Sequence, residues 1–154
     1  AFGRWAADRI AEAIEFEGPD TVAAVFLEPV QNAGGCFPPP PGYFERVREI
    51  CDEYDVLLVS DEVMTGWGRT GRLWACDHAG IAPDILCTSK GLTGGAVPLA
   101  ATLACEKVYQ AHYSTDRART FFHSSSYTAN PIACAAGLGI PGRRLLARLG
   151  LLAS

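Results

Sequence analysis

The segment from Val56 to Val59 is a short run of β-branched and aliphatic side chains that ends just before Asp61. A run of this length, without polar alternation, is typical of a strand that is buried on both faces of a parallel sheet. Ligands of open α/β sheets bind at the carboxyl ends of such strands. The run therefore predicts an α/β fold and places Asp61 where a ligand would bind.

A second apolar run covers residues 84–88, follows Pro83 and leads to Lys90 and Gly91. The proline ends whatever helix precedes the run, and the glycine lets the backbone turn sharply after the lysine. If the two runs are neighbouring parallel strands, Asp61 and Lys90 meet over one edge of the sheet. A structural salt bridge and an active site are the two interpretations of such a pair.

The elements around these runs follow the order of an α/β sheet. Apolar residues at helical spacing predict helices over residues 4–17 and 43–55, and an apolar run predicts a strand over residues 21–27 that leads to Glu28. The glycines and prolines of residues 34–41 predict a rigid loop, which serves either as a spacer or as a substrate-facing segment. Strand, helix and strand in this order predict a parallel crossover.

Glycines and hydroxyl groups dominate the segments that come later. The glycine-rich residues 65–71 predict a loop against a ligand or a neighbouring chain, and the small residues of 98–105 predict a further strand. Residues 121–131 form a hydroxyl-rich turn before an alanine-rich helix start. That arrangement predicts an anion site at the helix N-terminus.

Composition narrows the kind of partner. The chain of 154 residues is 49% hydrophobic and 19% charged, which predicts one globular core. Its net charge of -4 argues against nucleic acid and acidic membranes and favours a small-molecule ligand. No apolar run reaches the length of a membrane span and no export signal is recognisable, so we expect a cytoplasmic protein. The six cysteines lack a Cys-x-x-Cys pair, which predicts reduced core thiols and no metal site.

Four blocks of the sequence together resemble a known family. In chain order they are EPVQ, LLVSDEVMTGWGRTG, PDILCTSKGLTGG and FFHSSSYTANPIACAA. Their order and spacing are similar to those of the class III pyridoxal-phosphate aminotransferases, and the resemblance covers about residues 10–136. It implies the large domain of a fold type I transferase, a mostly parallel sheet flanked by helices, with pyridoxal 5'-phosphate as cofactor.

The resemblance also implies roles for individual residues. Lys90 would form a Schiff base with the cofactor and move the proton at the substrate Cα, and Asp61 would pair with the pyridine nitrogen. Val63 would pack on the ring, and Glu28 would lie near Asp61 in the ring's polar surroundings.

A final pair of roles concerns the cofactor phosphate. Ser126, with the backbone of Ser125, matches the position that reaches this phosphate across the interface of a homodimer. Met64 stands where some relatives carry glutamine near the phenolic oxygen, so the chain would lack that donor.

Two branches of the family compete. The later blocks look most like the biotin-pathway aminotransferases, which aminate 8-amino-7-oxononanoate with S-adenosylmethionine, whereas residues 28–63 are also close to the ω-amino-acid:pyruvate branch. A racemase or aminomutase chemistry, and a non-catalytic fragment, are the remaining alternatives.

The two ends of the chain depart from the family pattern. Residues 1–136 match part of the cofactor-binding large domain, and residues 137–154 form an atypical tail that indicates truncation or a shifted reading frame. We therefore expect the isolated chain to show little transamination.

Overall fold

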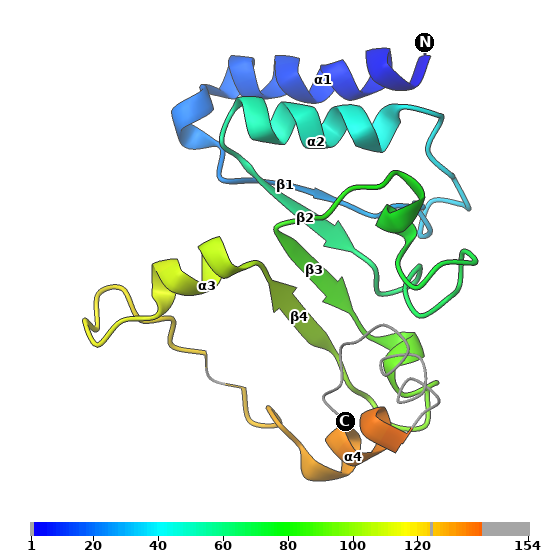
Figure 1. The fold of residues 1–154 in the computed structure, drawn as a ribbon, viewed down its shortest axis with the longest axis vertical. Helices are drawn as coiled ribbons and strands as arrows, with labels where there is room; N and C mark the ends of the chain where they lie inside the picture. The colour runs from blue at the N-terminus through cyan, green and yellow to red at the C-terminus, as the bar shows by residue number, and fades with distance from the viewer. Residues whose placement is uncertain (1, 124, 140–154) are drawn as a thin grey trace.

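A four-stranded sheet with strand order β1-β2-β3-β4 forms the centre of the computed structural model, which describes residues 2–123 and 125–139 (Figure 1). The strands are β1 (Ala24–Leu27), β2 (Leu57–Asp61), β3 (Ile85–Thr88) and β4 (Ala101–Ala104). β1, β2 and β3 are parallel, and β4 is antiparallel to β3. The predicted α/β fold with a mostly parallel sheet is confirmed. The sequence did not predict that β4 is antiparallel to its neighbour.

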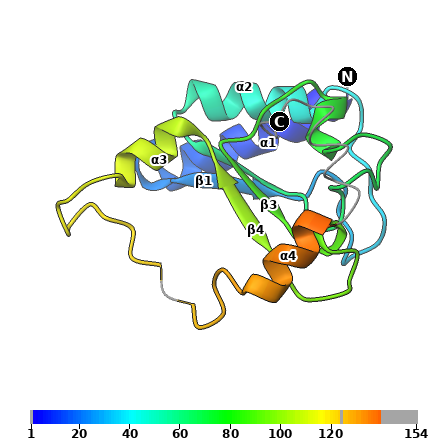
Figure 2. The same ribbon diagram turned by 60° about the horizontal axis from the view of Figure 1, so that its bottom comes forward.

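Four α-helices accompany the sheet: α1 (Phe2–Glu17), α2 (Tyr43–Glu53), α3 (Glu106–His112) and α4 (Pro131–Gly139). Three short 3-10 helices, η1 (Pro19–Thr21), η2 (Ala75–His78) and η3 (Lys90–Leu92), connect them to the strands. α1 and α2 lie side by side at one end of the molecule, and α4 lies at the opposite end (Figures 1 and 2). Residues 137–139 of the predicted atypical tail belong to α4, and the remainder of that tail lies outside the described residues.

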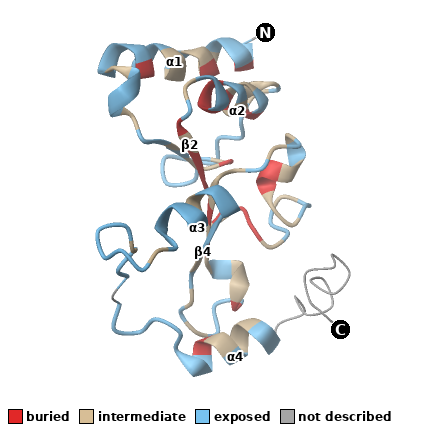
Figure 3. Cartoon of the chain, turned by 60° about the vertical axis from the view of Figure 1, so that its left-hand side comes forward, coloured by how far each residue is buried: buried red, intermediate tan, exposed pale blue. Residues whose placement is uncertain are grey.

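The core lies between α1, α2 and the sheet. Buried side chains line the facing sides of the two helices and continue into β2, whereas the outer strands are largely exposed (Figure 3). Leu58 is fully buried under α2, but Phe26 of β1 and Leu103 of β4 are 61% and 50% exposed. The buried cluster consists of Ala7, Ile14, Val47, Ile50, Cys51, Val56 and Leu58.

Asp84 joins the helix layer to three strands. Its Oδ2 accepts hydrogen bonds from Arg48 Nη1 of α2 and from the Leu58 N–H of β2, both at 2.8 Å. Its backbone oxygen accepts the Cys105 N–H at 2.8 Å, next to the end of β4. Burial raises the pKa of Asp84, but the bonds from Leu58 and Arg48 outweigh it and hold the pKa below its usual value. The carboxylate therefore stays charged and fixes the register from which β3 begins.

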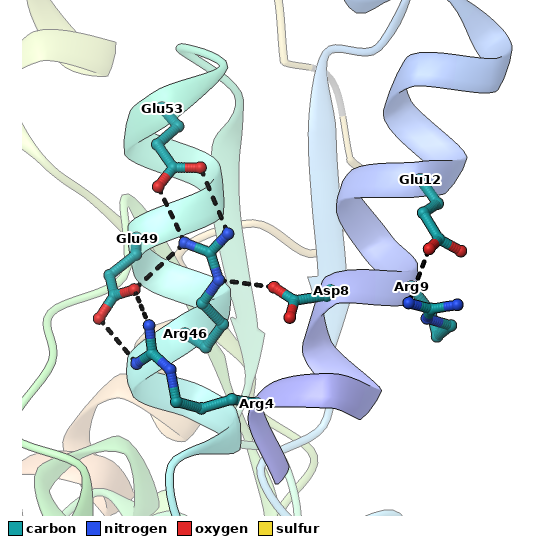
Figure 4. Close-up of polar contacts among 7 residues, drawn as sticks. All are labelled: Arg4, Asp8, Arg9, Glu12, Arg46, Glu49 and Glu53. Atoms are coloured by element: carbon teal, nitrogen blue, oxygen red, sulfur yellow. Dashed lines mark hydrogen bonds and ion pairs between the residues drawn. The ribbon is translucent and has the colours of Figure 1, made fainter. Parts of the chain in front are cut away.

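An ion-pair network on the outer side links α1 to α2 (Figure 4). The Arg46 guanidinium contacts Asp8 at 2.7 Å, Glu53 at 2.8 Å and Glu49 at 3.1 Å. Its side chain is only 17% exposed, so it also packs its methylene stem between the helices. Arg46 is the centre of this network.

Arg46→Ala is expected to lower the free energy of unfolding by about 1 kcal/mol, because three carboxylates share one largely covered Arg46 side chain. Urea denaturation followed by circular dichroism measures the effect. Glu12→Ala is the matched control, since it removes a single exposed pair with Arg9 inside α1 and should change nothing measurable. Equal effects of the two substitutions would show that the network adds nothing beyond a surface pair.

Candidate active site

A cleft of about 470 Å³ opens at the carboxyl ends of β1 and β2. Two carboxylates face it: Asp61, the last residue of β2, and Glu28, which directly follows β1. Because Leu27 pairs with Ser60 across the two parallel strands, the residues that follow them lie side by side. The volume falls in the range of small-molecule sites.

The proline loop forms another wall of this cleft. Gln31 and Phe37 pair through two backbone hydrogen bonds of 3.2 and 3.0 Å, which close a small hairpin. Pro38, Pro39 and Pro40 then line the cleft together with Tyr43 of α2. Of the two interpretations of this loop, the structure supports the substrate-facing one.

Asp61 is held in one orientation by its own turn. Its Oδ1 accepts a hydrogen bond of 3.0 Å from the Val63 N–H, and no donor among the described residues engages Oδ2. Val63 is half-buried beside it. At the edge of the cleft, the Oδ1 atom of Asp61 is thus hydrogen-bonded within the turn, and its Oδ2 atom can accept a hydrogen bond from a ligand.

Lys90 begins η3, with one residue between it and the end of β3, and is exposed. β3 runs parallel to β2 with Cys87 paired to Asp61, so the lysine and the aspartate lie at the same edge of the sheet. The Lys90 amine contacts the Met64 sulfur at 2.6 Å and is not among the groups that line the cleft. Its long, flexible side chain allows the amine to turn toward the cleft.

The salt-bridge interpretation has no contact to support it. Within the described residues, neither Asp61 nor Lys90 takes part in an ion pair; the pairs join other groups. The sequence's other lysine, Lys107, behaves differently, since it lies 2.7 Å from Asp55. The hydrogen bond to this carboxylate raises the pKa of Lys107.

The two serines predicted to bind the cofactor phosphate do not line the cleft at the ends of β1 and β2. Ser125 and Ser126 are exposed in the loop before α4, where the Ser125 carbonyl accepts the Thr128 N–H at 3.2 Å. No hydrogen bond among the described residues joins them to the cleft. At the start of α4, the Asn130 side chain accepts the N–H groups of Ile132 and Ala133 at 3.0 and 3.3 Å and so caps the helix.

Glu62 is a residue whose importance the sequence reasoning missed. It is fully buried and accepts hydrogen bonds from the backbone N–H groups of Ala75 at 3.0 Å and Cys76 at 2.9 Å, as well as from the Thr65 hydroxyl. The alternation of side chains along a strand could have indicated this role, because consecutive side chains point to opposite faces of the sheet and Glu62 directly follows Asp61. Asp61 therefore serves the cleft, and Glu62 fastens the 65–76 segment to the end of β2.

The buried thiol beside Glu62 is not a nucleophile. Burial raises the pKa of Cys76 to about 12, and the negative charge of Glu62 adds to the shift. The thiolate population near neutral pH is therefore negligible.

Comparisons with known proteins agree with this geometry. The family model "Aminotransferase class-III" matches residues 4–140. A probable aminotransferase of Mycobacterium tuberculosis is 61% identical over 137 residues, which cover 89% of this chain and 29% of that protein.

Solved transaminase structures resemble the chain as well. A thermostable (S)-enantioselective omega-transaminase from Thermomicrobium roseum superposes with a TM-score of 0.87 at 39% identity, covering 97% of this chain and 33% of its own. An amine transaminase from an uncultivated Pseudomonas species, in a form with bound pyridoxal phosphate, gives a TM-score of 0.85 at 38% identity, with 94% and 33% covered.

The chain spans about a third of the length of these relatives. The described part contains no helix long and apolar enough to cross a bilayer. Pyridoxal phosphate, the predicted cofactor, is the cofactor of the matched family. The match over residues 4–140 shows that the chain belongs to the class III aminotransferase family.

Proposed function

We propose that this chain supplies the lysine and the aspartate of a pyridoxal-phosphate-dependent transaminase. One observation carries the proposal: Lys90 and Asp61 follow neighbouring parallel strands and stand at one sheet edge without being paired to each other. The omega-transaminase and amine transaminase neighbours support the same reaction class.

The residues at this edge fit the cofactor by their chemistry. A bound pyridoxal phosphate supplies an aldehyde and a pyridine ring that withdraws electrons from the substrate Cα. Lys90 offers the amine that can attach to the aldehyde, and the available Oδ2 of Asp61 offers an acceptor for the protonated ring nitrogen. Glu28 adds a second carboxylate in the same cleft, and Val63 would pack against the ring.

Proton transfer at the substrate is the further role of the lysine. With pyridoxal phosphate bound, the Lys90 amine would also be the group that accepts and donates the proton at the substrate Cα, because the side chain is long and forms no ion pair among the described residues. Met64, whose sulfur contacts this amine at 2.6 Å, provides a weak acceptor that leaves the amine free to move.

The substrates form the finer part of the proposal. Transfer from S-adenosylmethionine to 8-amino-7-oxononanoate in biotin synthesis is the first assignment, from the resemblance of the later sequence blocks. Transfer between an ω-amine or ω-amino acid and pyruvate is the second, and the neighbours described as omega-transaminases favour it. Parallel assays with both donor sets on a subunit of the relatives' full length, containing this segment, distinguish the two.

Assembly and location complete the proposal. The resemblance implies a homodimer, and the sequence, which lacks a recognisable export signal, favours a cytoplasmic location. Ser125 and Ser126 are exposed in the described structure and therefore free to meet a second subunit's cofactor.

The proposed lysine is tested by incubating the protein with pyridoxal phosphate, reducing with borohydride and mapping the peptides. We expect the pyridoxyl group on Lys90 in about tenfold excess over Lys107, because a positioned amine reacts faster than a surface amine. The raised pKa of Lys107 acts in the same direction.

Lys90→Arg is the control, since it keeps the charge and removes the reactive amine. It should abolish the adduct at position 90 and leave labelling of Lys107 unchanged. Equal labelling of the two lysines in the parent chain would contradict the proposal and favour a non-catalytic segment.

A further inference from the structure

Trp67 donates a hydrogen bond from its indole Nε1 to the Thr88 hydroxyl at 2.7 Å. Thr88 is the last residue of β3, is 2% exposed, and precedes Lys90 by two positions. A bond to so buried a hydroxyl lies in a low-dielectric environment, where it is stronger than at the surface. The indole therefore fixes the end of the strand from which the lysine emerges.

The same side chain lies against the backbone just after the lysine. A Cβ atom added at Gly91 would lie 2.5 Å from the Trp67 Cβ and 2.9 Å from its Cγ. Only glycine permits this approach without displacement of the chain. Trp67 thus contacts residues on both sides of Lys90: the Thr88 hydroxyl before it and the Gly91 backbone after it.

The position of Trp67 is itself determined by its surroundings. Its φ of 63° lies in the left-handed region, which is costly for a bulky residue and persists only where neighbours enforce it. The Trp74 ring meets the Trp67 ring edge-on at 5.3 Å, and a Cβ at Gly66 would lie 2.7 Å from Trp74. The Gly66 N–H donates to the Glu62 carbonyl at 2.9 Å, which ties this loop to β2.

We propose that Trp67 is a positioning residue for Lys90: through Thr88 and Gly91 it holds the turn from which the reactive amine is presented. This inference rests on the proposed function of Lys90. Within its own chain, the glycine-rich loop of residues 65–71 contacts the residues on either side of Lys90.

Trp67→Phe tests the bond while keeping an aromatic ring against Gly91. Labelling of Lys90 by pyridoxal phosphate and borohydride should become about tenfold slower relative to Lys107, because the turn loses a buried hydrogen bond and the amine loses its orientation. The ratio of the two adducts is read by peptide mapping. Lys107 acts as an internal reference, since it lies in α3 and is paired with Asp55.

The double variant Trp67→Phe/Thr88→Val separates positioning from stability. Removing both partners of a buried hydrogen bond restores stability more than removing one. We expect its melting temperature to recover while Lys90 labelling stays as slow as in Trp67→Phe. Recovery of the labelling ratio together with the melting temperature would overturn the inference.

Trp5→Phe is the matched control, because it makes the same change at a half-exposed position on α1 and should leave the ratio unchanged. An unchanged ratio in Trp67→Phe, with preferential labelling of Lys90 in the parent, would overturn the inference and leave the function of Lys90 intact. Absence of preferential labelling in the parent would overturn the proposed function and the inference with it.

Discussion

Asp61→Asn is expected to lower the rate of transamination about 10²- to 10³-fold, which is the scale of losing one positioned electrostatic partner in an active site. The carboxylate can hold a proton on the pyridine nitrogen, and the neutral amide cannot. The turn should survive, because an asparagine oxygen can still accept the Val63 N–H that now lies 3.0 Å from Oδ1. Turnover is measured in a subunit of the relatives' full length that contains this segment.

The adduct at Lys90 separates a catalytic role from a structural one. In Asp61→Asn it should still form, because the amine and its strand are unchanged. Glu28→Gln, which alters the neighbouring carboxylate of the same cleft, is the comparison variant and should cost less. Full turnover by Asp61→Asn would remove the aspartate from its proposed role.

Glu62→Ala is expected to lower the free energy of unfolding by about 3 kcal/mol, because it leaves buried hydrogen-bond donors without the acceptor that the carboxylate now provides. The donors are the N–H groups of Ala75 and Cys76 and the hydroxyl of Thr65. Glu62→Gln should cost less than alanine but remain destabilising, because its single amide NH2 group would face a backbone N–H donor. Urea midpoints from circular dichroism measure both.

Glu17→Ala serves as the control, since this glutamate ends α1 at the surface and its removal should leave the urea midpoint unchanged. Hydrogen exchange should further show that the 65–76 segment opens in Glu62→Ala before the strands do. A stable alanine variant with a protected segment would mean that other contacts hold this loop.

The features that could be predicted from the sequence are those with a strong local pattern. The run before Asp61 has too many aliphatic side chains to sit anywhere but in the interior, and β2 is indeed buried along its middle. β1 starts at Ala24 and not at residue 21, because Pro19–Thr21 forms a 3-10 turn in which the Thr21 hydroxyl bonds to the Glu17 and Gly18 carbonyls at 2.8 Å. A side chain that bonds to the local backbone in this way competes with strand formation, and it leaves no periodic pattern of apolar residues in the sequence.

Other features depend on contacts between distant segments. α3 was not predicted because its seven residues bury no side chain and so display no apolar face. β4 is antiparallel to β3, a direction that residues 89–100 between the two strands do not indicate, because it depends on how the strands pair. The link between Trp67 and Thr88 joins residues 21 positions apart and becomes visible only in three dimensions.

Sequential strand order also has a consequence for how the site forms. Each strand of β1-β2-β3-β4 pairs with the next one along the chain, so no distant segment has to thread between them. The pairings nevertheless join residues well separated in the sequence, such as Ala24 with Leu57 and Val59 with Ile85, and parallel pairing of this kind forms more slowly than local structure. Glu28, Asp61 and Lys90 consequently reach one edge only when β1, β2 and β3 have paired, so the chemical edge and the parallel sheet form together.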